Sequence, residues 1–294
     1  ANAVAIRIAR AANKKDNIAI CGYHGWHDWY LSANLNSNNG ENLDEHLLKG
    51  LDIKGVPKKL KKTVFPFNYG NIKELEKIVK NNNIGVIKME VCRNTLPNIK
   101  FLKSVRSLAN KKNIVLIFDE CSTGFRQSFG GLHKTTGVIP DIVIFGKAMG
   151  NGYAITAVVG KTNIMEYSQK TFISSTFWTE RIGPTAALKT IEIMQKEKTW
   201  ITITKIGKKI QNGWKGLARS LDLKIKVNGI PSLTNFIFSS DKNQLYKTLI
   251  TQEMLKNNFL ATNAVNCCIK HNNGILKNED RFHNLKWMQA NVLK

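Results

Sequence analysis

The sequence lacks any apolar run of about 18 residues, so no segment has the pattern of a membrane-spanning helix. It also lacks a disulfide framework. Its five cysteines, at positions 21, 92, 121, 267 and 268, are odd in number and form neither a CxxC pair nor a metal-ligand spacing. Cys21 and Cys121 adjoin expected buried strands. This pattern is typical of reduced thiols, and we expect a cytoplasmic protein without a bound metal.

Acidic residues are scarce, with 21 Asp+Glu against 44 Lys+Arg and a formal net charge of +23. Such a balance raises the question of a nucleic-acid partner. However, the lysines are spread over the whole length, and the densest cluster, PKKLKKT at 57–63, has no interleaved aromatic residues that could stack on bases. We therefore expect a solvated basic surface, with no nucleic-acid partner and no membrane partner.

The first 15 residues, ANAVAIRIARAANKK, are amphipathic and contain arginine. A transit peptide has this pattern, and so does a surface helix packed on a domain. We favour the packed helix. Because the sequence starts inside this helix, we expect that the protein extends further upstream.

Strand and helix patterns alternate along the first two thirds of the chain. The sequence predicts strands at 17–23, 85–90, 113–120, 141–147 and 154–160, with helices at 72–80 and 99–111. Long helices follow at 183–196 and 201–221, then short strands at 224–227 and 235–238 and a helix at 244–256. We expect an α/β fold, with a large domain (1–198) built on a mostly parallel sheet and a small C-terminal α+β domain (199–294).

Chemically suggestive residues follow several of these strands. Ligands bind beyond the carboxyl ends of the strands in an open α/β sheet, and there the sequence places Tyr23, His24, Asp119 and Lys147. Taken alone, Asp119 would more often cap a helix or form an ion pair. A lysine after a buried strand, flanked by glycines, is less ordinary because burying its charge is costly. Lys147 is therefore a candidate for Schiff-base chemistry.

The stretch FDECSTGFRQSFGGLHKTTGVIPDIVIFGKAMGNGYA (118–154) closely resembles the signature of the class III pyridoxal-phosphate (PLP) dependent aminotransferases. Within that family it is similar to the glutamate-1-semialdehyde aminomutases and their sister aminotransferases. Weaker similarity runs from Ala1 to about Asn263. The resemblance implies the type I fold of PLP-dependent transferases, PLP as cofactor and a homodimer with shared active sites. It also implies transfer of an amino group from a small-molecule donor to a carbonyl acceptor.

The resemblance assigns the two main roles to Lys147 and Asp119. Lys147 would hold PLP as a Schiff base and, once displaced by substrate, would serve as the general base. Asp119 would pair with the pyridine nitrogen and keep it protonated, so that the ring acts as an electron sink.

Other positions follow from the same resemblance. Tyr23 would stack on the cofactor ring with His24 beside it, and Asn94 would contact the ring's phenolic oxygen. Glu90 and Arg93 would face the substrate. Around Ser175–Pro184 the family carries a threonine that reaches the partner subunit's cofactor phosphate. Counting from Pro184 indicates Thr179, whereas matching the Thr-Phe pair indicates Thr176, and the sequence leaves both open.

Two departures from the family pattern leave alternatives open. The turn that holds the phosphate would lie just before Ala1, and GNGYA at 150–154 replaces the aminomutases' Gly-Gly-Gly-Leu-Pro, which favours a sister aminotransferase. A PLP-dependent racemase or epimerase on the same scaffold is one alternative, and a non-catalytic remnant is another. His24 and His27 form an H-x-x-H pair that resembles a metal site, but without a third ligand at a sensible spacing we expect them to pack within a loop.

Overall fold

The computed structural model describes residues 1–36, 42–44, 50–92, 94–256 and 258–271. The chain divides into two compact units. Residues 1–93, 97–124 and 130–192 form unit 1, while residues 94–96, 125–129 and those from 193 onward form unit 2. The expected boundary between folding domains at residue 198 stays a prediction.

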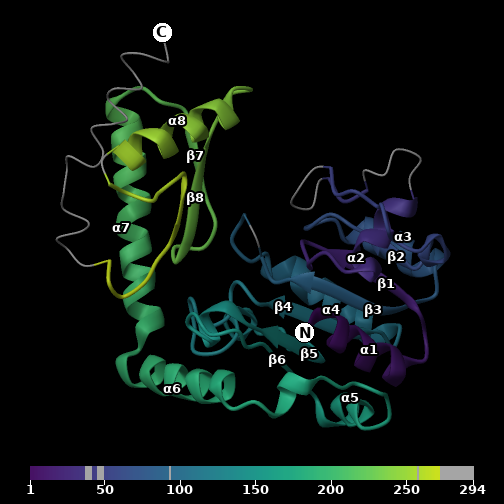
Figure 1. Cartoon of the computed structure of the whole chain (residues 1–294). Coiled ribbons are helices and arrows are strands. Elements are labelled where there is room, and N and C mark those ends of the chain that lie inside the picture. Colours follow the sequence, from purple (N-terminus) through teal and green to yellow (C-terminus); the bar gives the residue numbers. More distant parts are fainter. Residues whose placement is uncertain (37–41, 45–49, 93, 257, 272–294) are drawn as a thin grey trace. The chain divides into compact units, whose positions relative to one another are not determined.

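A six-stranded sheet in the order β2-β1-β3-β4-β5-β6 forms the centre of unit 1 (Figure 1). Strands β1 to β5 pair in parallel, and β6 pairs antiparallel with β5. The expected mostly parallel sheet is therefore confirmed. The strands are β1 (Asn17–Cys21), β2 (Val64–Pro66), β3 (Ile84–Glu90), β4 (Val115–Glu120), β5 (Ile142–Phe145) and β6 (Ala157–Gly160).

Helices cover this sheet. The first of them shows how the amphipathic N-terminal segment is placed. Helix α1 (Asn2–Asn13) buries Ala5, Ile6, Ile8 and Ala9 against alternate strand residues, among them Val86, Val115, Ile117 and Ile142. The N-terminal segment is thus a packed helix of the domain. The other helical elements of unit 1 are α2 (Asp28–Leu31), α3 (Ile72–Asn81), α4 (Ile99–Lys111), α5 (Thr162–Met165), most of α6 (Ile182–Glu197), and the short 3-10 turns η1 (Ser32–Asn36), η2 (Lys58–Leu60), η3 (Leu132–Thr135), η4 (Lys147–Met149), η5 (Glu166–Ser168) and η6 (Thr176–Thr179).

Unit 2 has the α+β character expected from the sequence. An antiparallel sheet β7-β8-β9 (Ile225–Asn228, Leu233–Phe238, Ala264–Asn266) accompanies α7 (Thr199–Ser220) and α8 (Asn243–Lys256). Its core contains Trp214, Phe236, Phe238, Tyr246 and Ile250. Across the described ranges, no helix is both long and apolar enough to cross a membrane.

Candidate active site

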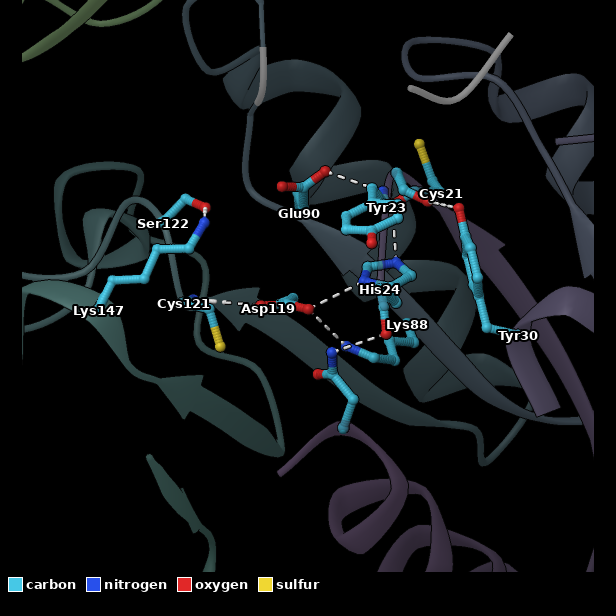
Figure 2. A network of polar contacts seen from close by, with 12 residues as sticks. Cys21, Tyr23, His24, Tyr30, Lys88, Glu90, Asp119, Cys121, Ser122 and Lys147 are labelled. Carbon is cyan, nitrogen blue, oxygen red and sulfur yellow. Dashed lines mark hydrogen bonds and ion pairs between the residues drawn. The ribbon is translucent and has the colours of Figure 1, made fainter. Parts of the chain in front are cut away.

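The candidate site forms where neighbouring strands of the unit 1 sheet end (Figure 2). Glu90 ends β3 and stands in register with Asp119 on β4. Lys147 lies two residues after the end of β5, and Tyr23 and His24 lie two and three residues after the end of β1. Because parallel strands deliver their carboxyl ends to one edge, residues far apart in sequence meet there. In Figure 2, Asp119 lies between Lys147 on one side and His24 with Lys88 on the other.

Asp119 is buried, with 6% of its surface exposed, and its carboxylate accepts three contacts. His24 Nδ1 lies 2.9 Å and Lys88 Nζ 3.0 Å from Oδ2, and the backbone N–H of Cys121 donates to Oδ1 at 3.1 Å. Burial alone would raise the pKa of this carboxyl. The charge of Lys88 and the hydrogen bond from His24 outweigh burial and hold the pKa well below its ordinary value. Asp119 is therefore ionised at neutral pH.

Lys88 was not singled out from the sequence. It lies within β3, opposite Ile117 of β4, and its side chain is fully buried. Since alternate residues of a strand share a face, Lys88 points to the same side of the sheet as Asp119, two residues further along β4. The signal was available, because Lys88 is the one charged residue between apolar neighbours in GVIKME. Its partner could be identified only from the strand register.

His24 is 1% exposed, and both ring nitrogens face acceptors, Nδ1 towards Asp119 and Nε2 towards the carbonyl oxygen of Cys21 at 3.2 Å. Burial, and next the charge of Lys88, lower the pKa of His24 to about 4. The ring is therefore neutral at pH 7 and carries a single N–H. We assign this proton to Nδ1, because a carboxylate is a stronger acceptor than a carbonyl. His24 then donates to Asp119 and fixes its orientation.

The lowered pKa of His24 predicts a loss of stability in mild acid. In the unfolded chain His24 has a pKa of about 6.5, whereas in the folded protein it becomes protonated only near pH 4. The contribution of neutral His24 to the free energy of unfolding is fully present above the pKa of the unfolded chain. It decreases by about 3 kcal/mol in all as the pH drops from 6.5 towards 4. Asp119 adds little loss in this window, because its contribution is lost mainly below its ordinary pKa of 3.8. Urea unfolding of the wild type and His24→Asn at pH 6.5 and 4.5 measures the effect. The variant should lose clearly less stability, and equal losses would contradict the assignment.

Lys147 starts η4 with a φ of 43°, in the left-handed region that non-glycine residues seldom adopt. Such backbone strain is concentrated at functional sites. The side chain is exposed within unit 1, and Nζ donates to Ser122 Oγ at 2.6 Å. Ser122 was not identified from the sequence, because it lies in a loop after β4 and meets Lys147 only through the fold. It holds the amine of Lys147 in a defined position.

Glu90 anchors the loop that carries Tyr23. Its Oε2 accepts the backbone N–H of Tyr23 at 3.1 Å, and the hydroxyl of Tyr30 donates to the carbonyl of Gly22 at 3.0 Å. Gly22 has a φ of 104°, and a Cβ there would collide with the Glu90 carboxylate. The positive φ favours glycine at this position, and a larger residue would also displace the Glu90 carboxylate. Tyr23 is half-buried and packs edge-on against Tyr30. The structure shows Glu90 binding the loop, and its expected substrate contact stays a prediction.

Glu120 holds the loop that carries Ser122. Its fully buried carboxylate accepts the hydroxyl of Thr123 at 3.0 Å, the backbone N–H groups of Leu132 and His133 at 2.5 and 2.9 Å, and a contact from His133 Nδ1 at 2.6 Å. The loop from Cys121 onward is therefore tied at both ends to the last residue of β4. This restraint limits the positions open to Ser122.

Of the remaining expected residues, three belong to the described part of the chain. Asn94 is exposed and belongs to unit 2, where its carbonyl accepts the N–H of Gly229 at 3.3 Å. Thr176 and Thr179 are exposed at the two ends of η6 in unit 1, and the hydroxyl of Thr179 lies 3.4 Å from the carbonyl of Thr176. Arg93 lies outside the described residues. The cofactor and substrate roles of these four residues stay predictions.

The sequence pattern of the family Aminotransferase class-III matches residues 1–257, and the chain belongs to this family. Among curated proteins, the chain is 36% identical over 261 residues to 3-aminobutyryl-CoA aminotransferase of Cloacimonas acidaminovorans, which covers 86% of this chain and 58% of the relative. It is 34% identical over 252 residues to glutamate-1-semialdehyde 2,1-aminomutase of Nitrosopumilus maritimus, covering 81% and 56%. The chain thus spans a little over half the length of these relatives.

Solved structures agree on the fold. The FumI protein of Sphingopyxis sp. MTA144, solved in its PLP internal aldimine form, superposes with a TM-score of 0.84 at 18% identity, over 99% of this chain and 68% of that one. An omega-transaminase from Sphaerobacter thermophilus gives a TM-score of 0.82 at 18% identity, over 97% and 71%. The type I fold of PLP-dependent transferases, expected from the sequence, is confirmed.

Proposed function

We propose that the protein is a PLP-dependent aminotransferase in which Lys147 holds the cofactor and Asp119 pairs with its pyridine nitrogen. The observation that carries the proposal is the arrangement of these two residues at the carboxyl ends of the adjacent strands β4 and β5, with Asp119 buried and ionised. The membership in class III and the transaminase fold support it.

The residues fit PLP on chemical grounds. A carboxylate offers about four acceptor positions, and three contacts to Asp119 occupy part of them, which leaves room for a pyridinium N–H. When bound, PLP supplies an electron sink that stabilises negative charge on the substrate carbon next to the amino group. Asp119 would keep the proton on the ring nitrogen. Lys147 would hold the cofactor through Nζ, positioned by Ser122, and would later move a proton at that atom.

We propose that the substrates are a small-molecule amino donor and a carbonyl acceptor. The curated relatives are named an aminotransferase and an aminomutase, both of which act on amino groups. The higher identity to the aminotransferase supports intermolecular transfer, as does the departure of residues 150–154 from the aminomutase pattern.

A half-reaction tests the proposed function directly. The PLP-loaded protein is mixed with single amino donors without an acceptor, and the absorption spectrum is followed while the products are analysed. We expect the pyridoxamine form to accumulate together with one equivalent of the carbonyl product. Inversion of the donor's configuration without the pyridoxamine form would instead support a racemase. Failure to bind PLP would support a non-catalytic remnant.

We further propose a cytoplasmic homodimer with shared active sites. The segment around Thr176 and Thr179 exposes four large apolar side chains in unit 1, with Phe172 84% and Phe177 78% exposed, beside Trp178 and Ile182. Several large apolar side chains exposed along one short segment favour an interface there. A partner seated there would bring one of the threonines to the cofactor phosphate of the other subunit. Sedimentation at micromolar concentration tests the assembly, and a monomer would overturn it.

A further inference from the structure

The proposed function gives no role to Lys88, the buried cation of the site. Its ammonium group has no exposed surface and contacts Asp119 Oδ2 at 3.0 Å. A lysine is costly to bury, and pairing it with a carboxylate often gives no net gain over apolar residues of similar volume. Stability alone therefore gives no sufficient reason for a lysine at this position in the apolar centre of β3.

The position of Lys88 matters because of the residue that it contacts. Asp119 is the carboxylate proposed to hold the pyridine nitrogen, so two cations, Lys88 and the protonated ring, would share one buried anion. With neutral His24 donating to the same oxygen, the group Lys88–Asp119 is already neutral before the cofactor binds. Protonating the ring then leaves a net positive charge in a buried site. Without Lys88 the same protonation would yield a neutral pair.

Like charges at one carboxylate lie close enough to shift each other's proton affinity by about one pKa unit or more. The other titratable groups that face Asp119 do not reverse this balance. His24, in the loop after β1, is neutral. Cys121 lies in the loop after β4. Burial, and next the charge of Asp119, raise the pKa of its thiol to about 12, so the thiol carries no charge at neutral pH.

We propose that Lys88 is a positioning residue that shares the Asp119 carboxylate with the pyridine nitrogen of PLP and thereby weakens the hold of that nitrogen on its proton. Lys88 orients the carboxylate and at the same time reduces its effective charge towards the ring. Bound PLP would therefore be a weaker electron sink in this protein than it would be beside an aspartate that has no neighbouring cation. The inference rests on the proposed function, since it requires bound PLP.

The test is a pH titration of the ring nitrogen by ¹⁵N NMR of protein loaded with ¹⁵N-labelled PLP. Lys88→Met removes the charge and keeps the volume, and Lys88→Gln keeps a hydrogen-bond donor without charge if the methionine variant fails to fold. We expect half-protonation of the ring nitrogen at a pH higher by about one unit or more in either variant. Lys161→Met is the matched control, because Lys161 pairs at 2.7 Å with Asp141, which lies just before β5 in the same unit. It should leave the titration unchanged.

Each outcome decides the matter. A ring nitrogen that titrates identically in the wild type and in both Lys88 variants overturns the inference while the proposed function stands. A shift of equal size in Lys161→Met would show a general charge effect and also overturns it. A wild-type protein that binds no PLP overturns the proposed function and this inference together. In the protein without cofactor, ¹³C NMR of Asp119 adds an independent readout, since losing Lys88 should raise the pKa of that carboxyl.

Discussion

Lys147→Ala should abolish turnover, with a loss of several orders of magnitude, because the variant lacks both the group that holds the cofactor and the proposed general base. The absorption band of lysine-bound PLP should vanish as well, although PLP can still bind through its other contacts. The measurement combines the spectrum, the half-reaction and mass-spectrometric mapping of the borohydride-reduced wild type. The reduced adduct should map to Lys147.

Lys112→Ala is the control for this experiment, because Lys112 is an exposed residue at the end of α4, away from the strand ends that form the site. It should retain the spectrum and the rate. An adduct on another lysine, or measurable turnover in Lys147→Ala, would show that the left-handed turn at Lys147 serves a different purpose.

Asp119→Asn should cut the rate by several orders of magnitude. An amide cannot hold the pyridinium proton through an ionic pair, so the electron sink weakens. The structure adds a second effect, because the buried charge of Lys88 loses its counter-ion. Removing one partner of a buried ion pair costs about 3–5 kcal/mol of stability. The variant should therefore unfold at a lower temperature as well as react slowly, and rates must be compared on the folded fraction.

Asp141→Asn separates these two effects. Asp141 also carries two ion pairs, which are partly buried, accepting from Arg106 at 2.8 Å and Lys161 at 2.7 Å, but it belongs to no part of the proposed site. We expect this variant to lose stability while its folded fraction keeps its rate. If Asp119→Asn behaves in the same way, with near-normal turnover of the folded protein, Asp119 is a structural residue only.

The sequence predicted the strands that bear the site because each is a largely apolar run, as expected for strands covered on both faces. Strands β2 (Val64–Pro66) and β9 (Ala264–Asn266) were not expected, since three residues are too few to show a period. Lys147 and Asp119 were proposed as site residues from their places at strand ends and from a long family signature, and these roles stay predictions. The contacts of Lys88 and Ser122 could not be predicted, because they arise from a diagonal neighbour on the next strand and from a loop returning to β5.

The last two residues of β4 have consequences for how this protein can change. Asp119 and Glu120 are consecutive, so they point to opposite faces of the sheet. Asp119 meets Lys88 and His24, while Glu120 fixes the loop at His133. A slip of β4 by a single residue in one direction would put Phe118 in the place of Asp119 and leave Lys88 without a counter-ion. A slip in the other direction would put Cys121 in the place of Glu120 and leave the loop without its anchor. A one-residue insertion or deletion within β4 should therefore be more disruptive than one in an exposed loop.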